Sequence, residues 1–275
     1  MSAAPNLTPS GLAWHAVDLV PPWHEAPETI VFVAGLGTTA AMWSEWLPPL
    51  ASRYRLVHAD LRGFGASRVP TGHRFTLASL IDDILEVANA AGAPRFHLVG
   101  EALGGAACIA LACRGAAAPL HSLTVCNAPF RGASLDNVAA WRALIGQGGV
   151  EAWSARMMAQ RFHGDEVDPA AWRWYEATQR ASSAETLLAL GDVLLSTALV
   201  DLLPLIMVPT LVLCGDASPY VSVDAATEMA RTVPGAELRV FDHARHGLPF
   251  SHARECSAAL ADFLARRCPS PDRSS

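Results

Sequence analysis

The chain has 275 residues, of which 51% are hydrophobic and 17% are charged, so it can bury a large core without division into independent units. Its formal net charge is -6, and it has no run of Lys or Arg, which argues against a nucleic acid or an anionic membrane surface as partner. The composition does not exclude small neutral or anionic organic molecules as ligands. We expect one α/β domain with an insertion, as a monomer or a homodimer.

Cysteine usage and the first residues indicate the compartment. The six cysteines fall mostly in apolar runs without a C-x-x-C spacing, which predicts buried thiols in a reducing compartment and no zinc site. Residues 1–9 lack a basic segment followed by an apolar one, and no apolar run reaches the roughly 18 residues of a membrane helix. We therefore expect a soluble, cytoplasmic protein. The cysteines are Cys108, Cys113, Cys126, Cys214, Cys256 and Cys268.

Strand-like and helical segments alternate along the chain, which predicts a mainly parallel sheet with helices on both faces. The predicted strands cover residues 29–34, 55–60, 96–100, 120–126, 210–214 and 238–241, and the predicted helices cover 75–91, 106–114 and 252–267.

The alternation stops between residues 131 and 203, where a helical segment rich in tryptophan takes over. We expect residues 1–130 and 204–275 to form the core and 131–203 a helical cap. Pockets are commonly apolar, so aromatic and methionine side chains of the cap are candidates for substrate contact, although each of them can equally well pack the cap onto the core. The candidates are Trp153, Met157, Phe162 and Trp174. The tail from Cys268 to Ser275 is expected to fray.

One short segment carries the strongest signal. Gly100-Glu101-Ala102-Leu103-Gly104-Gly105 follows a predicted strand and precedes a predicted helix. Small residues at these positions permit a tight turn that lifts one side chain to the carboxyl edge of a sheet, as in the G-x-S-x-G pattern of nucleophilic serines. Ala102 occupies the serine position, so the turn has no nucleophile.

Four short segments that contain glycine, taken in their order and spacing, make the chain resemble the α/β-hydrolase superfamily over almost its full length. Residues 37–43, the strand near Leu123 and the size of the insertion are similar to the 3-oxoadipate enol-lactonase and esterase group. The resemblance implies an eight-stranded, mainly parallel sheet. The four segments are 34–38 (AGLGT), 62–67 (RGFGAS), 100–105 (GEALGG) and 245–247 (RHG).

The resemblance also implies roles for individual residues. His246, in the loop after the last strand, matches the general base, with His243 as its nearest rival. The backbone N–H groups of Leu36 and Leu103 match the oxyanion hole, which leaves no side-chain requirement at either position.

The acid that would orient His246 is a second departure from the pattern. The family position three residues after Gly215 is Ser218. Asp216 is our tentative acid, although it can also cap its own loop. Asn127, after the sixth strand, is a substitute that could orient a histidine without charge, and Asp242 and Asp136 are more distant options.

Charged groups near the site are ambiguous from sequence. Glu101 lies beneath the expected active-site floor, where burial would raise its pKa unless it is hydrogen-bonded, and it serves either as a structural group or as a proton relay. A cation for an anionic substrate is available from Arg131, Arg142, Arg156 and Arg161, and the spacing does not select among them.

Three explanations of Ala102 follow. The first is an ester or lactone hydrolase inactivated by replacement of its serine, and this is the favoured hypothesis. The second is a natural non-hydrolytic enzyme, such as a lyase, isomerase or cyclase, in which His246 is the base. The third is a ligand-binding or scaffold protein that kept the fold. None implies a metal or an organic cofactor, and the expected partner is a small-molecule substrate.

Overall fold

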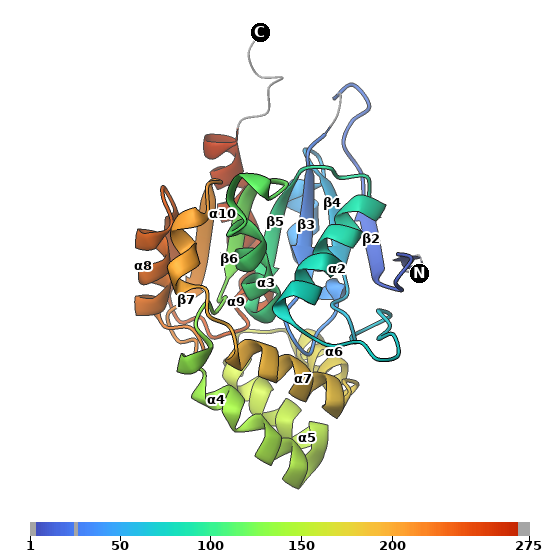
Figure 1. The fold of residues 1–275 in the computed structure, drawn as a ribbon, viewed down its shortest axis with the longest axis vertical. Coiled ribbons are helices and arrows are strands. Elements are labelled where there is room, and N and C mark those ends of the chain that lie inside the picture. Colours follow the sequence, from blue (N-terminus) through green and yellow to red (C-terminus); the bar gives the residue numbers. More distant parts are fainter. Residues whose placement is uncertain (1–3, 25–26, 269–275) are drawn as a thin grey trace.

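The computed structural model describes residues 4–24 and 27–268, and its centre is one eight-stranded sheet (Figure 1). The strand order is β1-β2-β4-β3-β5-β6-β7-β8. The expected fold class is therefore confirmed. The strands are β1 (Asn6–Leu7), β2 (Ala13–Val17), β3 (Thr29–Val33), β4 (Arg55–Ala59), β5 (Phe96–Glu101), β6 (Leu120–Cys126), β7 (Thr210–Gly215) and β8 (Glu237–Phe241).

Strands β3 to β8 pair in parallel, whereas β2 pairs antiparallel with β1 and β4. The central strands β3, β5 and β7 are buried along their whole length, which explains their continuous apolar runs. The sequence pattern did not predict strands β1 and β2, because β1 consists of two exposed residues and only part of β2 is buried.

Helices cover both faces of the sheet. In Figure 1, α2 (Leu77–Ala90) and α3 (Ala102–Ala112) lie in front of the strands and α10 (Ala253–Arg267) lies behind them. Two large apolar clusters correspond to these faces, one including α2 and α3 and the other including α10 and the 3-10 segment η1 (Ala40–Trp46). The remaining core elements are α1 (Leu47–Leu50), η2 (Gly115–Ala117), α8 (Val223–Thr232) and α9 (Leu248–Ser251).

Helix α3 begins immediately after β5, four residues earlier than the sequence pattern predicts. All but one of its residues are buried, because α3 packs against β5, β6 and α2. A helix that is apolar all round has no polar face to mark its first turn. The position of this turn matters because it begins with Ala102.

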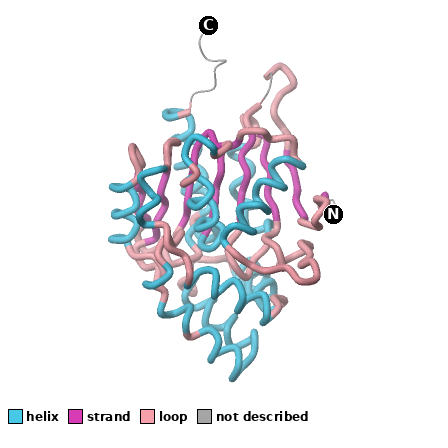
Figure 2. Tube along the Cα trace, viewed as in Figure 1, coloured by secondary structure: helices cyan, strands magenta, loops and turns pink. Residues whose placement is uncertain are grey.

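The insertion between β6 and β7 is helical and gathers at the carboxyl ends of the parallel strands (Figure 1). Figure 2 shows loops between this helical group and the sheet. The helix α5 is kinked at Gly149, whose φ of 68° and ψ of -170° are not helical. The elements are η3 (Gly132–Ser134), α4 (Asp136–Ala139), α5 (Trp141–Arg161), α6 (Pro169–Arg180), α7 (Ala184–Leu195) and η4 (Val200–Leu205).

The structure also bears on the expectations about cysteines and membrane helices. All six cysteines are free thiols, and five of them are buried. Within residues 4–24 and 27–268, no helix has the length and apolarity needed to cross a bilayer. Of the tail from Cys268 to Ser275 that is expected to fray, residues 269–275 lie outside the described residues.

Candidate active site

The turn from β5 to α3 holds Ala102 in the left-handed region, with φ of 48°. This conformation disfavours residues other than glycine, so close packing must impose it. A Cβ on Gly104 would lie 2.3 Å from the carbonyl oxygen of Ala34, and one on Gly100 would lie 2.5 Å from Sγ of Cys108. The small residues around Ala102 therefore let strand and helix approach closely enough to form the elbow.

Ala102 lines a cavity of about 20 Å³ beneath the helical insertion. Such a volume accommodates about one water molecule and no organic substrate, so the site is closed in this conformation. Residues from the core loops and from α5 and α7 line it together. They are Leu36, Ala102, Leu103, Pro129, Leu135, Val138, Trp141, Met157, Arg161, Leu194, Tyr220 and His246.

The two predicted oxyanion residues, Leu36 and Leu103, both line this cavity and are almost fully buried. Leu103 is in the first turn of α3, where backbone N–H groups have no partner within the helix. Leu36 follows β3, and its carbonyl accepts a hydrogen bond from Arg161 at 2.8 Å, which fixes the peptide of this turn. Both residues of the predicted oxyanion hole therefore lie at the same cavity as position 102.

His246 lines the same cavity and is 4% exposed. Its Nδ1 lies 3.1 Å from the hydroxyl oxygen of Ser218, and its ring packs on Tyr220 with centroids 4.6 Å apart. Burial, together with the positive charge of Arg161, lowers the pKa of His246 well below its ordinary value. The imidazole is therefore neutral at pH 7.

Asp216 does not take the place that the sequence analysis favoured for it. Its carboxylate accepts a hydrogen bond from the N–H of Ala244 at 3.0 Å and so caps the loop after β7. The contact with Nδ1 of His246 comes from Ser218, the residue at the family position of the acid. A hydroxyl can donate or accept here, but it carries no charge to stabilise an imidazolium.

Asn127 acts on the backbone of the histidine loop. Its amide nitrogen donates to the carbonyls of Arg245 and His246 at 3.1 and 3.0 Å, and its amide oxygen accepts from the N–H of Gly215. Asn127 therefore joins the ends of β6 and β7 to the loop that carries His246. It holds the position of that residue without contacting the ring. The more distant options, Asp136 and Asp242, are both exposed.

A buried ion pair joins the elbow to the insertion. Nη1 of Arg161, at the end of α5, donates to Oε1 of Glu101 at 3.0 Å, and the two residues are 1% and 0% exposed. Burial raises the pKa of Glu101, and the Arg161 guanidinium opposes this by favouring the carboxylate. The structural interpretation of Glu101 thus has a geometric basis, since its partner both neutralises it and binds the carbonyl of Leu36.

The other arginines considered for substrate binding lie elsewhere. Arg131 pairs with Glu228 at 2.7 Å, and Arg142 pairs with Asp192 at 3.1 Å on the exposed surface. Of the four, Arg161 lines the cavity. Its Nε is buried and has no hydrogen-bond partner among the residues that the structure describes.

The four predicted substrate-binding residues separate in space. Met157 lines the cavity, whereas Trp153 is fully buried against Gly37 and Trp141. Phe162 belongs to an apolar cluster with Met158 and Tyr175. Trp174 is partly exposed and stacks on Phe250 with centroids 5.8 Å apart, so its expected contact with the cavity is not made in this conformation.

Sequence reasoning missed Tyr220, whose ring packs against that of His246 at an interplanar angle of 54° and whose hydroxyl donates to the side-chain oxygen of Gln160 in α5. Its place two residues after Ser218, in the loop expected to hold the acid, was the available signal.

With this geometry in place, comparison with known proteins identifies the family. Residues 28–253 match the family model described as the alpha/beta hydrolase fold. The chain belongs to this family. The match spans the sheet from β3 to β8 and includes the elbow, the insertion and the loop of His246.

Individual relatives of this family member carry hydrolase names. A putative carbamate hydrolase RutD from Pantoea ananatis is 28% identical over 252 residues, covering 89% of this chain and 90% of its own length. The 3-oxoadipate enol-lactonase 1 of Acinetobacter baylyi is 26% identical, covering 79% of this chain and 82% of its own length. These names support a hydrolase in general terms.

Solved structures agree in fold. The crystal structure of an enol-lactonase from Burkholderia xenovorans aligns with a TM-score of 0.83 at 23% identity, covering 94% of this chain and 98% of that one. A hydrolase from Pseudomonas aeruginosa aligns with a TM-score of 0.81 at 26% identity, covering 92% and 94%.

Proposed function

We propose that the protein hydrolyses a small, intrinsically labile carbonyl compound, of the carbamate or enol-lactone class, by direct addition of water. The observation that carries this proposal is the pairing of Ala102 with Ser218. Two positions of the expected triad are changed together, and replacement of the nucleophile alone would not account for the second change.

The proposed reaction needs no acyl-enzyme. Water adds to the carbonyl carbon while the C=O electron pair moves onto oxygen, where the N–H groups of Leu36 and Leu103 stabilise the charge. The C–O or C–N bond to the leaving group then breaks, and the leaving group receives the proton lost by the water. His246 is the group in the cavity that can hold this water and pass on its proton.

A neutral His246 fits this role because direct addition of water requires no lasting imidazolium. The role needs the tautomer with its proton on Nδ1, which donates to the Ser218 hydroxyl and leaves Nε2 free to accept from the water. Loss of the acid in a serine triad costs about 10⁴-fold in rate, while an oxyanion hole and substrate binding alone retain about 10³- to 10⁴-fold over water. A site of this kind therefore suits a substrate with a low intrinsic barrier.

The substrate class rests on chemistry and on relatives. An enol-lactone has a carbonyl next to an enolate leaving group, and an aryl carbamate has one next to a phenolate. The names of two relatives contain the terms carbamate and enol-lactonase. The apolar cavity wall, with Arg161 as its one charged side chain among the lining residues, supports a small substrate. Ion pairing of Arg161 with Glu101 leaves little free charge for a dianion.

One observation favours a second function, the disabled serine hydrolase. Ala102 keeps a strained φ of 48°, the conformation that presents a nucleophile at an elbow. Under this alternative, restoring the serine alone would restore covalent hydrolysis.

The test compares the natural chain, Ala102→Ser, Ser218→Asp and the double variant on an aryl carbamate, an enol-lactone and a p-nitrophenyl ester. Under the proposal, the natural chain turns over at least one labile substrate, shows no burst and forms no covalent adduct by intact mass. His246→Ala should lower that rate about 100-fold. Burst kinetics should appear only in the double variant.

The contrary result is equally clear. An inactive natural chain, combined with burst kinetics in Ala102→Ser alone, would overturn the direct-water proposal and establish the second function.

A further inference from the structure

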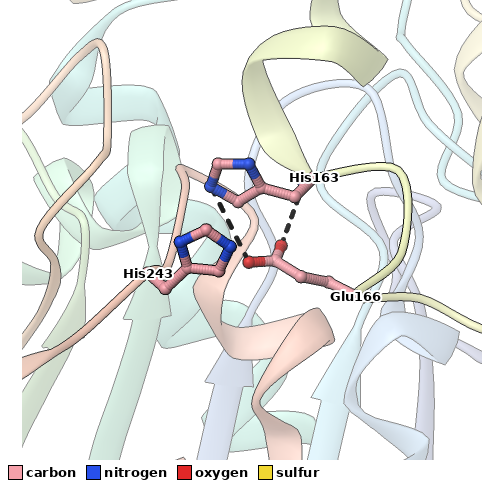
Figure 3. Close-up of side chains that lie close together, drawn as sticks. All are labelled: His163, Glu166 and His243. Atoms are coloured by element: carbon pink, nitrogen blue, oxygen red, sulfur yellow. Dashed lines mark hydrogen bonds and ion pairs between the residues drawn. The ribbon is translucent and has the colours of Figure 1, made fainter.

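We propose that His163, Glu166 and His243 form a binding site for a divalent transition metal of the zinc type, separate from the cavity at Ala102. Figure 3 shows the three side chains converging from two loops, residues 162–168 after α5 and the loop between β8 and α9. The inference is independent of the proposed hydrolase function.

The donor atoms lie close enough for a common ligand. One ligand atom from each of the three residues lies within 4.8 Å of the others. Nε2 of His163 and Oε1 of Glu166 are 3.9 Å apart. Zinc bonds to nitrogen and oxygen are about 2.0–2.2 Å long, which separates tetrahedral donors by about 3.4 Å, so donor atoms that now lie up to 4.8 Å apart need to approach by up to about 1.4 Å.

Two of these donors lack another use within the described residues. Nε2 of His163 and Oε1 of Glu166 are both buried without a hydrogen-bond partner, and the Glu166 side chain is only 10% exposed. The second carboxylate oxygen, Oε2, accepts the N–H of His163 at 3.0 Å. Glu166 is thus held in place by one oxygen while the other points into the cluster. Unpaired buried polar atoms of this kind cost free energy unless a ligand satisfies them.

The third donor has the freedom that binding requires. The rings of His163 and His243 are stacked, 4.2 Å apart and within 6° of parallel. Imidazole lone pairs lie in the ring plane, so parallel rings cannot both point at one ion, and one ring must turn. His243 is the exposed one of the two, so we expect its ring to turn.

The donor chemistry selects the class of ion. Two imidazoles and one carboxylate suit zinc and neighbouring first-row divalent metals better than magnesium or calcium, which prefer oxygen ligands. With three protein ligands, the remaining position belongs to water or to an exogenous donor.

Metal binding here would tie the insertion to the catalytic loop. His243 precedes His246 by three residues, and the N–H of Gly247 already donates to the carbonyl of Arg161 at 2.9 Å. An ion shared by residues 162–168 and the His243 loop would reinforce the same junction and stabilise the closed cavity.

The experiment titrates chelator-treated full-length protein with Zn²⁺ by calorimetry, and with Co²⁺ by visible absorption, which reports the coordination geometry. The natural chain should bind one ion. His243→Ala and Glu166→Gln should each lower the Zn²⁺ affinity at least about tenfold. Loss of a residue that only hydrogen-bonds to a metal ligand already lowers metal affinity by about that factor. Thermal unfolding of the natural chain should shift upward with Zn²⁺, and the shift should shrink in both variants.

A matched control is His121→Ala. His121 and His97 also lie near a carboxylate, with Nδ1 of His121 3.8 Å from Glu28, but Nδ1 of His97 is already hydrogen-bonded to Ser122. Unchanged Zn²⁺ affinity in His121→Ala supports the proposal. Absence of binding in the natural chain, or binding that survives in His243→Ala and Glu166→Gln, would overturn it.

Discussion

The hydroxyl of Ser218 lies 3.1 Å from Nδ1 of His246, where a serine hydrolase would place a carboxylate. Together with Ala102 at the elbow, this contact leaves a histidine between two uncharged neighbours. Ala102 and His246 line one cavity, and the side chain at Nδ1 of His246 is a hydroxyl rather than a carboxylate.

The first prediction concerns this contact. Ser218→Asp should raise the pKa of His246, because a carboxylate beside the ring favours the imidazolium. The measurement is an NMR titration of the His246 ring protons. Asp216→Asn is the control and should leave the His246 pKa unchanged. A shift in the control of similar size would return Asp216 to the role of orienting acid.

The second prediction concerns the buried ion pair. Arg161→Met should lower the free energy of unfolding by about 3–5 kcal/mol, because it leaves the Glu101 carboxylate buried and unpaired. Denaturant unfolding measures the loss. Arg142→Met removes an exposed pair with Asp192 and should cost no more than about 1 kcal/mol. Equal effects of the two substitutions would contradict the structural role of Arg161.

The third prediction tests the space beside that pair. A Cβ on Gly35 would lie 1.7 Å from Oε2 of Glu101, so Gly35→Ala should destabilise the protein by about 1–3 kcal/mol. Gly146→Ala, in α5, is the comparison because a Cβ there meets nothing within 4 Å. Helix propensity predicts that Gly146→Ala is neutral or stabilising by up to about 1 kcal/mol. The prediction fails if Gly35→Ala is as stable as the natural chain.

The fourth prediction is a pH dependence of stability. Burial and the neighbouring His15 lower the pKa of His58 to about 4. Above pH 6.5 the residue is neutral in both folded and unfolded chains and has no effect. Between pH 6.5 and about 4 only the unfolded chain takes up the proton, so stability falls, by up to about 3 kcal/mol. Unfolding of His58→Gln across this range should show a shallower fall than the natural chain, and parallel curves would refute the assignment.

Sequence reasoning reached the fold and the elbow because both are set by local patterns. Continuous apolar runs marked the buried parallel strands, and the glycines around Ala102 marked the tight turn. His246 could be placed because its loop follows the last strand. The edge strand β1 carried no such signal, since two exposed residues have no apolar pattern.

The remaining parts of the site depend on contacts between distant segments. Arg161 and Glu101 are 60 residues apart, and nothing in the spacing distinguished Arg161 from Arg142. The cluster of His163, Glu166 and His243 joins two loops that only the folded insertion brings together. The contact of Ser218 with His246 was obscured because a nearby aspartate offered the expected chemistry.

The conformation of the elbow does not depend on which small residue stands at position 102. Its backbone is shaped by the glycines that let β5, α3 and the turn after β3 meet, and not by the residue at its tip. Alanine and serine differ by one oxygen atom, and either can occupy this tip. The scaffold that presents the tip can therefore stay the same whichever of these two residues stands there.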